Sequence, residues 1–435
     1  MDSRERESQA RSFKVLLTDT DRWPAPTRLA IALADAGCNV FAVCRTPGHP
    51  LLKTRAVRRT CPYRGLRPLD SLVAAIDAVQ PDLIVPCDDR GVQHLHELHA
   101  QAPVGSLAAL IERSLGAPES YPVVSSRYQL LRIASEEQIP VPRTLRIDSM
   151  QAAKNLFSTQ SSPWVLKAEG TSGGRGVRFA ESANQAEQSF LELTTPPGVV
   201  EILKRLALNR DRTWLLPRRH RHPPEVIGQV CIHGRPANCA VVSWQGRVLA
   251  GFAVEVLSSS GATGPAIVSR LVEGSLMLYA AERLAARLCL SGFFGLDFMI
   301  EERTGATYLI EMNPRCTPLC HLQLGPGRDL VGALWAQLAQ QSYRPRAACV
   351  DHELIAYFPQ AWTTKSEFLD ASFQDVPHQD PALCHELLNP WSERSMFGRA
   401  VDHLSWIRGR SRLPAAHVFP EAIPLNDLKL QQCAI

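Results

Sequence analysis

The first hundred residues alternate between short apolar runs and segments of helical periodicity, and this rhythm constrains the fold most strongly. Two segments, 27–37 and 70–80, have the spacing of helices, with Gly37 ending the first and Asp70 capping the second. Three apolar runs read as buried strands: 13–19, 39–45 and 82–89. Strands alternating with helices predict a parallel sheet covered by helices, an α/β arrangement.

The turn after the first strand argues against a dinucleotide site. It reads TDTDRWPAP (18–26) and lacks the G-x-G-x-x-G pattern that lets a pyrophosphate approach a helix N-terminus. The sequence therefore predicts a Rossmann-like sheet and disfavours a nicotinamide-linked dehydrogenase.

The rest of the chain changes character and predicts an α+β organisation. Residues 101–125 read as a connector, after which a helix begins at Ser126, with Gln129 three residues on as in a capping box. Strands and hairpins with two intervening helices follow from about 163 to 315. One further strand is expected at 353–359, and the remaining sequence is irregular.

A hairpin between residues 292 and 315 carries two carboxylates. Its strand-like runs, GFFGLDFMI and TYLIEMNPR, flank a turn that ends in Gly305, which suits the left-handed position of a three-residue loop. That register places Asp297 directly opposite Glu311, with Cβ atoms roughly 5 Å apart. Asn313 lies two residues further along the same face.

Two facing carboxylates repel each other unless a cation or a shared proton intervenes. Two acidic ligands and one amide are oxygen donors, which suit Mg²⁺ or Mn²⁺ and not zinc. Magnesium sites of this kind are usually completed by substrate phosphates. The alternative is a register slipped by one residue, with Asp297 facing solvent.

A glycine-rich turn follows an apolar strand in PWVLKAEGTSGGRGVRF (163–179), and Lys167 lies near the end of that strand. Glycines allow backbone N–H groups to approach phosphate oxygens, and a lysine adds a point charge. The pattern is not G-x-x-x-x-G-K-[ST], so a P-loop is excluded. A plain flexible hairpin remains the alternative explanation of this segment alone.

The order of these motifs resembles the ATP-grasp superfamily, particularly the carbamoyl-phosphate synthetase-like branch and other carboxylate–amine ligases. The likeness covers about residues 13–340, and YLIEMNPR (308–315) matches the family's E-x-N-P-R signature. The resemblance implies a Rossmann-like pre-ATP-grasp domain followed by a two-subdomain ATP-grasp fold. The expected division is a flexible N-terminus at 1–12, the pre-ATP-grasp domain at 13–120, the ATP-grasp domain at 121–340 with its lid subdomain at about 140–228, and a poorly defined C-terminal segment at 341–435.

The resemblance also implies roles for single residues. Asp297, Glu311 and Asn313 would hold the metal ions that bridge the ATP phosphates. Arg315 would stabilise the transferring phosphoryl group or the acyl phosphate, and Lys167 would bind a phosphate. The other nucleotide contacts that the resemblance implies are Arg127, where many members carry lysine, the lid residues Ser172, Gly173, Gly174, Gly176 and Val177, and the hinge residues Gln229, Val230 and Ile232.

The hinge departs from the family pattern at two positions. Gln229 stands where many members have glutamate, although an amide can still accept from the adenine amino group. Pro236 stands where many have an acidic ribose partner, so Asn238 is the alternative partner. Arg270 is a weaker candidate for phosphate or substrate binding. Residues Cys316, Cys320 and His321 after the signature favour a pocket lining over a zinc site, because no second cysteine pair has suitable spacing.

Composition narrows the partners. The 435 residues carry a net charge of +4, too small to argue for nucleic acid or an anionic membrane. The polar N-terminus lacks a secretory h-region, and no run of about 18 apolar residues occurs. We therefore expect a soluble cytoplasmic protein with no nucleic-acid or membrane partner, and a homodimer as the common oligomeric outcome.

The resemblance implies a ligase that uses ATP and Mg²⁺ (or Mn²⁺) to convert a substrate carboxylate into an acyl phosphate. A small-molecule amine or a similar nucleophile would then displace phosphate. Such chemistry depends mainly on positioning and charge neutralisation. Two rivals stay open: an ATP-grasp phosphotransferase, and a nucleotide-binding regulatory protein without turnover.

Overall fold

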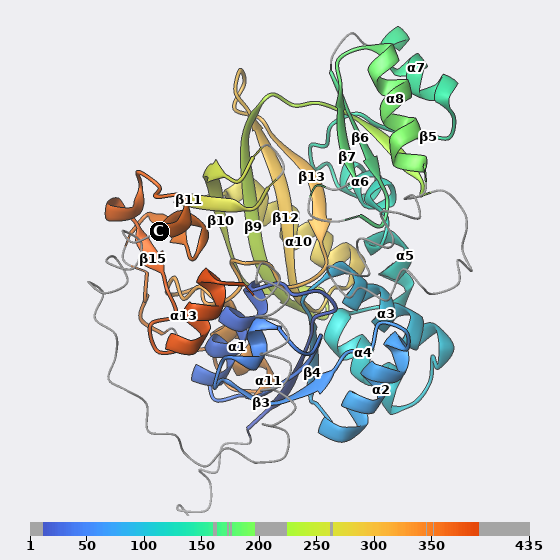
Figure 1. The fold of residues 1–435 in the computed structure, drawn as a ribbon. Helices are drawn as coiled ribbons and strands as arrows, with labels where there is room; N and C mark the ends of the chain where they lie inside the picture. Colours follow the sequence, from blue (N-terminus) through green and yellow to red (C-terminus); the bar gives the residue numbers. More distant parts are fainter. Residues whose placement is uncertain are drawn as a thin grey trace, which may run out of the picture.

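Three sheets organise the chain in the computed structural model (Figure 1). The structure describes residues 12–159, 163–171, 174, 176–195, 224–261, 264–344, 346–350 and 352–390. One sheet is formed near the N-terminus, a small one projects from the body of the molecule, and a seven-stranded sheet runs through its centre.

The N-terminal sheet is parallel, with strand order β3-β2-β1-β4, as the alternating pattern predicted. Its core consists of the fully apolar faces of β1 and β4 packed against flanking helices. The strands are β1 (Lys14–Thr18), β2 (Asn39–Cys44), β3 (Val57–Pro62) and β4 (Leu83–Pro86). The helices are α1 (Ala25–Asp35), α2 (Pro68–Val79), α3 (Asp89–Gln101) and α4 (Ser106–Leu115), with a 3₁₀ turn η1 at Pro50–Leu52.

Three expectations about this region were wrong or incomplete. Strand β3 was missed because it is an edge strand in which Arg58 and Arg59 are exposed, so it shows no apolar run. The expected connector at 101–125 contains α4, the 3₁₀ turn η2 (Pro118–Ser120) and α5 (Tyr121–Val124). Asp70 is not the cap of α2, because the helix begins at Pro68 and proline favours the first helical position.

The small projecting sheet is antiparallel and has the order β5-β8-β6-β7. Its strands are β5 (Thr144–Ile147), β6 (Trp164–Ala168), β7 (Val177–Ala180) and β8 (Val226–Val230). Helices α7 (Met150–Thr159) and α8 (Ala183–Thr194) lie over this sheet, where Trp164 is fully buried with Leu156 and Ala186. The chain segment before it forms α6 (Arg127–Glu136), and Ser126 caps that helix by accepting from the Gln129 N–H, as predicted.

The central sheet has the order β13-β12-β9-β10-β11-β14-β15. Its strands are β9 (Gly234–Trp244), β10 (Arg247–Ser259), β11 (Ala266–Val272), β12 (Gly292–Glu301), β13 (Thr307–Asn313), β14 (Leu354–Tyr357) and β15 (Phe373–Asp375). Helices α10 (Ser275–Leu288), α11 (Leu330–Leu338), α12 (Gln360–Thr363) and α13 (Pro381–Leu388) and the 3₁₀ turn η4 (Leu369–Ala371) accompany it.

Alternate residues of β9 point into two different cores, which places the sheet between two layers. Cys239 and Val241 pack with Leu284 of α10 and with residues of α6 on one face. Ala240 and Val242 pack with α11 and with α1 of the N-terminal sheet on the other. The N-terminal sheet and the central sheet therefore share one core.

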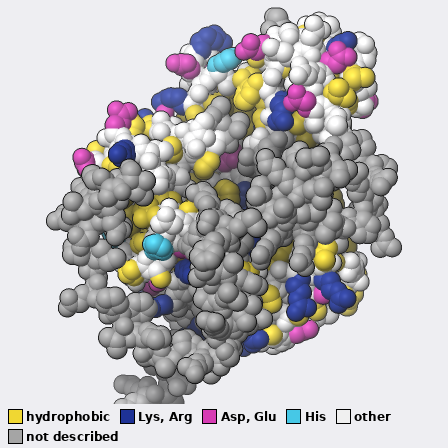
Figure 2. All heavy atoms as spheres, viewed as in Figure 1, with side chains coloured by type: hydrophobic (Ala, Val, Ile, Leu, Met, Phe, Trp, Pro, Cys, Tyr) yellow, Lys and Arg dark blue, Asp and Glu magenta, His cyan; other side chains and the backbone are white. Residues whose placement is uncertain are grey.

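No helix in the described part of the chain is long and apolar enough to cross a membrane. On the face drawn in Figure 2, described cationic and anionic side chains are interspersed and do not form a large patch of one sign.

Candidate functional site

The hairpin β12–β13 places Asp297 opposite Glu311, as the sequence predicted, but through a different turn. The strands close at Glu301, whose N–H donates to the Ala306 carbonyl at 2.8 Å, so the loop has four residues and not three. A bulge beside Asp297 shifts the register by one and restores the expected pairing. Gly305 does adopt the left-handed conformation, with φ of 73°.

Asp297 is held by two amides at the centre of the site. Its carboxylate accepts from Asn238 Nδ2 at 2.6 Å and from Asn313 Nδ2 at 2.9 Å. Burial, and then the charge of Glu311, raise the pKa of Asp297 from 3.8 to about 6. The structure thus pairs Asn238 with Asp297, whereas the sequence indicated it as an alternative ribose partner.

Glu311 lies among cations. Its Oε2 accepts from Arg127 Nε at 2.9 Å, and Lys167 is a second positive neighbour. Burial opposes ionisation of Glu311, but Arg127 and Lys167 outweigh it and hold the pKa of that carboxyl below its ordinary value. Burial lowers the pKa of Lys167, which is only 6% exposed, although Glu311 and Asp297 act in the opposite direction. Five charged side chains therefore lie close together at this point: Arg127, Lys167, Glu169, Asp297 and Glu311.

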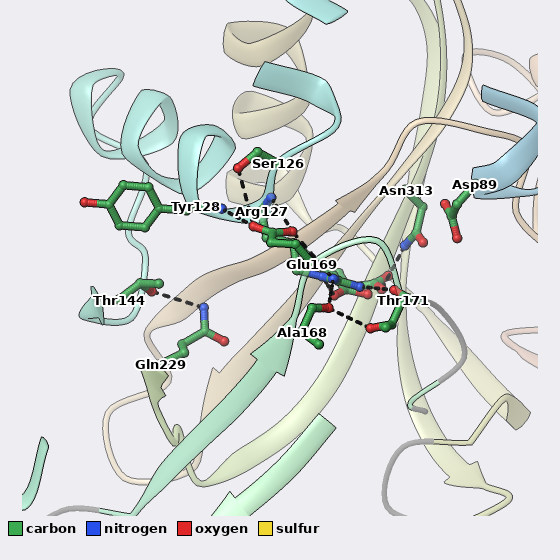
Figure 3. A network of polar contacts seen from close by, with 12 residues as sticks. Asp89, Ser126, Arg127, Tyr128, Thr144, Ala168, Glu169, Thr171, Gln229 and Asn313 are labelled. Atoms are coloured by element: carbon green, nitrogen blue, oxygen red, sulfur yellow. Dashed lines mark hydrogen bonds and ion pairs between the residues drawn. The ribbon is translucent and has the colours of Figure 1, made fainter. Parts of the chain in front are cut away.

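Arg127 ties the projecting sheet to the hairpin (Figure 3). Besides Glu311, its guanidinium donates to the carbonyls of Ala168 at 3.0 Å and Thr171 at 2.5 Å. Glu169 accepts from the backbone N–H groups of Arg127 and Tyr128 at 3.2 and 3.1 Å, so a carboxylate lies at the N-terminus of α6. The predicted nucleotide contact Arg127 is thus already bonded to protein groups on several sides.

Arg315 is anchored from the N-terminal region. Its Nε donates to Asp89 Oδ1 at 3.0 Å, and its Nη2 donates to Asn313 Oδ1 at 3.0 Å. Burial opposes the charge of Arg315, but Asp89 outweighs it and raises the pKa of the guanidinium above its ordinary value. Asp89 is the first residue of α3, three positions after the last residue of β4, so the carboxyl edge of the parallel sheet positions the signature arginine.

The glycine-rich turn is described only in part. Gly170 and Gly174 have φ of 71° and 72°, the conformation for which glycine is favoured. A Cβ atom at Gly176 would lie 2.0 Å from Thr171 Oγ1, so this position also requires glycine. Val177 begins β7 and pairs with Lys167. The predicted contacts Ser172 and Gly173 lie outside the described residues.

The predicted hinge connects the projecting sheet to the central sheet. Gln229 and Val230 end β8, and Ile232 lies in the short link before β9. Gln229 is 2% exposed, and its Nε2 lies 3.4 Å from Thr144 Oγ1 (Figure 3). Adenine recognition by this segment stays a prediction. Arg270, the weaker candidate, bonds to Glu255 at 2.8 Å, so its charge is already paired.

A cavity of about 480 Å³ opens beside these residues. Asp297, Glu311, Asn313 and Arg315 line one part of it, and Gly174 of the glycine-rich turn lines another. Apolar and aromatic residues cover much of the rest, from the start of α1, the segment after β13 and the β14–α13 region: Trp23, Pro24, Pro318, Leu319, Tyr357, Phe358 and Leu387. His321 lines this cavity as predicted, whereas Cys316 and Cys320 are buried in the core.

The donor set fits a divalent cation completed by phosphate. The described residues hold no group of three or more His, Cys, Asp and Glu that could hold a metal alone. Asp297, Glu311 and Asn313 supply two carboxylates and an amide, which are oxygen donors of the kind Mg²⁺ prefers. Burial and the charge of Glu311 both raise the pKa of Asp297. A bound cation would relieve the repulsion between the two carboxylates.

Sequence reasoning missed several residues that the structure brings to the site. Glu169 follows Lys167 by two positions. Asn238, which the sequence indicated only as a ribose partner, lies on β9 as the register partner of Asp297. Asp89 was visible only as part of an acidic strand end. Asp375 lies far along the chain in a segment with no motif, so no sequence signal pointed to it.

Comparisons with known proteins agree with the fold. No family model matches the chain. The β subunit of an ADP-forming succinate–CoA ligase from Acidithiobacillus ferrooxidans is 39% identical over 77 residues, which is 17% of this chain and 20% of that subunit. The chain therefore matches only about a fifth of the length of this curated relative.

Solved structures align over much more of the chain. The biotin carboxylase domain of 2-oxoglutarate carboxylase from Hydrogenobacter thermophilus, a dimer in complex with MgADP, ADP and bicarbonate, covers 78% of this chain and 72% of its own, at 15% identity and TM-score 0.55. N5-carboxyaminoimidazole synthetase from Staphylococcus aureus, complexed with ADP, covers 77% and 80%, at 9% identity and TM-score 0.53. L-Amino acid ligase from Bacillus licheniformis covers 77% and 75%, at 12% identity and TM-score 0.51.

These proteins are ATP-grasp relatives in fold, and the chain has the ATP-grasp fold. The parallel N-terminal sheet corresponds to the pre-ATP-grasp part. The small antiparallel sheet and the mainly antiparallel central sheet correspond to the ATP-grasp subdomains. The resemblance drawn from the E-x-N-P-R signature is therefore confirmed at the level of the fold.

Proposed function

We propose that the protein is an ATP-dependent ligase that activates a substrate carboxylate as an acyl phosphate for attack by an amine or a similar nucleophile. The observation that carries the proposal is the arrangement of Asp297, Glu311, Asn313 and Arg315 along one wall of the 480 Å³ cavity. Carboxylates, an amide and a guanidinium on one wall suit a phosphoryl transfer, which needs positioning and charge neutralisation more than covalent help.

Each residue has a role in this proposal. Asp297, Glu311 and Asn313 would hold Mg²⁺ (or Mn²⁺), which supplies charge neutralisation to the ATP phosphates when bound. Lys167 and the glycine-rich turn bind phosphate oxygens, and Gln229, Val230 and Ile232 bind the adenine. Arg315, fixed by Asp89 at 3.0 Å, stabilises the transferring phosphoryl group. Ribose recognition has no assigned residue, because Asn238 bonds to Asp297.

The ligands of the aligned structures support the cofactor part of the proposal. Two of the aligned structures contain ADP, and one of them contains magnesium. The three aligned proteins are a carboxylase domain, a synthetase and a ligase, so they differ in their reactions. A homodimer stays a prediction, for which the dimeric carboxylase domain is the parallel.

The test is ADP and phosphate release by the purified full chain with Mg²⁺, ATP and pools of small carboxylic acids and amines. Release that needs both an acid and a nucleophile supports ligation. Release that needs one substrate and leaves it phosphorylated would instead establish a phosphotransferase. ATP binding without turnover on every pool would contradict the proposal and favour a regulatory protein.

A further inference from the structure

Three distant parts of the chain meet at a buried carboxylate beside the proposed active site. Asp375 ends β15, Arg28 lies in α1, and His321 lies in the segment after β13. All three line the 480 Å³ cavity. Arg28 Nη2 bonds to Asp375 Oδ1, and His321 Nε2 lies 3.0 and 2.9 Å from the two carboxylate oxygens.

The carboxylate stays ionised over any ordinary pH range. Burial opposes its charge, but His321 and Arg28 outweigh that effect and hold the pKa of Asp375 at about 2. An ionised carboxylate that accepts from Nε2 fixes the proton of a neutral imidazole on that nitrogen. In the neutral form of this ring the lone pair lies on Nδ1.

The second ring nitrogen of His321 belongs to a side chain that lines the cavity. His321 Nδ1 makes no hydrogen bond within the described part of the chain, and it is not among the buried polar atoms there that lack a partner. It is therefore accessible, in a residue that lines the cavity shared with Arg315 and Glu311. The charged groups that line the same cavity are Asp375, Arg28, Arg315, Asp297 and Glu311.

We propose that His321, oriented by Asp375 and Arg28, is the general base that deprotonates an amine nucleophile. This inference rests on the ligase function proposed above. His321 Nδ1 takes one proton from the ammonium group, and the neutral amine nitrogen then bonds to the acyl carbon. The carbon–oxygen bond to phosphate breaks, and its electron pair leaves with the phosphate, which takes up the second nitrogen proton. The imidazolium later releases its proton to solvent.

The proposal also selects a substrate class. A primary amine is protonated near neutral pH and must lose protons to attack, so a base is useful to it. Tyr357, Phe358 and Leu387 line the cavity in the same region of the chain as Asp375, and Tyr357 is its register partner. These side chains suit the apolar part of the nucleophile. We therefore expect a primary amine on a mainly apolar body, such as an apolar amino acid, rather than a thiol or bicarbonate.

The experiment compares two nucleophiles on the same activated acid. Wild type is first screened with apolar amino acids offered as acid and as amine, and with coenzyme A and bicarbonate as rival nucleophiles. His321→Gln, Asp375→Asn and the control His385→Gln, an exposed histidine of α13 outside the cavity, are then assayed. Hydroxylamine, which is largely unprotonated at neutral pH, serves as the nucleophile that needs no base.

We expect His321→Gln to lose roughly 100-fold or more in amine-dependent kcat. Its hydroxylamine-dependent ADP release should stay within about threefold of wild type, and its amine activity should partly recover at high pH, where the amine is unprotonated. Asp375→Asn should show a smaller loss with the same pattern, as expected for a positioning residue. His385→Gln should match wild type.

The outcomes separate this inference from the proposed function. Equal losses with amine and hydroxylamine would mean that the three residues only hold the structure together, and would overturn the inference. Turnover with coenzyme A or bicarbonate in place of amines would overturn it too, while ATP-dependent ligation stood. No ADP release from wild type with any of these probes would count against the ligase function itself. As a measurement without substrates, ¹⁵N spectra should find His321 protonated on Nε2, and protonation on Nδ1 would contradict the base role.

Discussion

Replacing Asp297 with asparagine should stabilise the nucleotide-free protein at pH 8 while abolishing its Mg²⁺-dependent activity. In the folded protein, burial and the charge of Glu311 raise the pKa of Asp297 from 3.8 to about 6. A folded pKa above the unfolded value gives stability that is present below pH 4 and lost as the pH rises through about 6. Two pKa units correspond to about 3 kcal/mol.

Asparagine at position 297 cannot ionise, so the variant avoids this loss. It does give up one hydrogen bond, because its amide NH₂ cannot accept from both Asn238 and Asn313. That costs about 1 kcal/mol. The variant should therefore be about 2 kcal/mol more stable than wild type at pH 8, and its advantage should shrink by more than about 1 kcal/mol on going to pH 5.

Urea denaturation at pH 5 and pH 8, followed by tryptophan fluorescence without nucleotide, measures this difference. Glu302→Gln, in the exposed turn of the same hairpin, is the matched control and should show no such pH dependence. The electrostatic account would be refuted if the variant were less stable than wild type and this deficit were larger at pH 8 than at pH 5. Retained Mg²⁺-dependent turnover would refute the metal assignment.

Three further substitutions test other parts of the account. Arg315→Lys should keep ATP binding but lower kcat by roughly 100-fold, because the bonds to Asp89 and Asn313 need a planar guanidinium; a normal kcat would contradict this. Burial and then the charge of Asp19 raise the pKa of Asp88 from 3.8 to about 7. In denaturant titrations, the stability of Asp88→Asn relative to wild type should therefore increase as the pH rises from 5 to 8. A relative stability that does not change with pH would contradict this reasoning. Gly116→Ala should lower the free energy of unfolding by roughly 2–4 kcal/mol, since its Cβ would lie 2.2 Å from the Cys289 carbonyl at a φ of 102°, and an unchanged melting midpoint would disprove that reasoning.

The local parts of the fold could be predicted from the sequence because they depend on periodicity and turn chemistry. The parallel N-terminal strands, the cap at Ser126 and the pairing of Asp297 with Glu311 all follow from residues close together in the chain. The pairing was correct although the turn was not. The four-residue loop and the bulge compensate each other, and nothing in the residue types marks the bulge.

The parts that the sequence could not predict depend on contacts between distant segments. Strand β3 is recognised only by its place at the sheet edge, because its exposed arginines interrupt the apolar run that would predict a strand. Asp375 reaches His321 across 54 residues and Arg28 across 347, and no periodicity links such positions. Arg127 was expected to meet nucleotide, but only the folded chain brings Glu311 and the Thr171 carbonyl to its guanidinium.

The central claim is that the β12–β13 hairpin holds the metal that binds ATP phosphates, and calorimetric titration of ATP with and without Mg²⁺ tests it most directly. Glu311→Gln removes one of the two carboxylates and also the partner of Arg127. Wild type should bind ATP in a strongly Mg²⁺-dependent manner. In the titration with Mg²⁺, Glu311→Gln should bind ATP at least about tenfold more weakly than wild type, whereas the titration without Mg²⁺ should show no such loss of affinity. Equal Mg²⁺-dependent affinity in the two proteins would contradict the account.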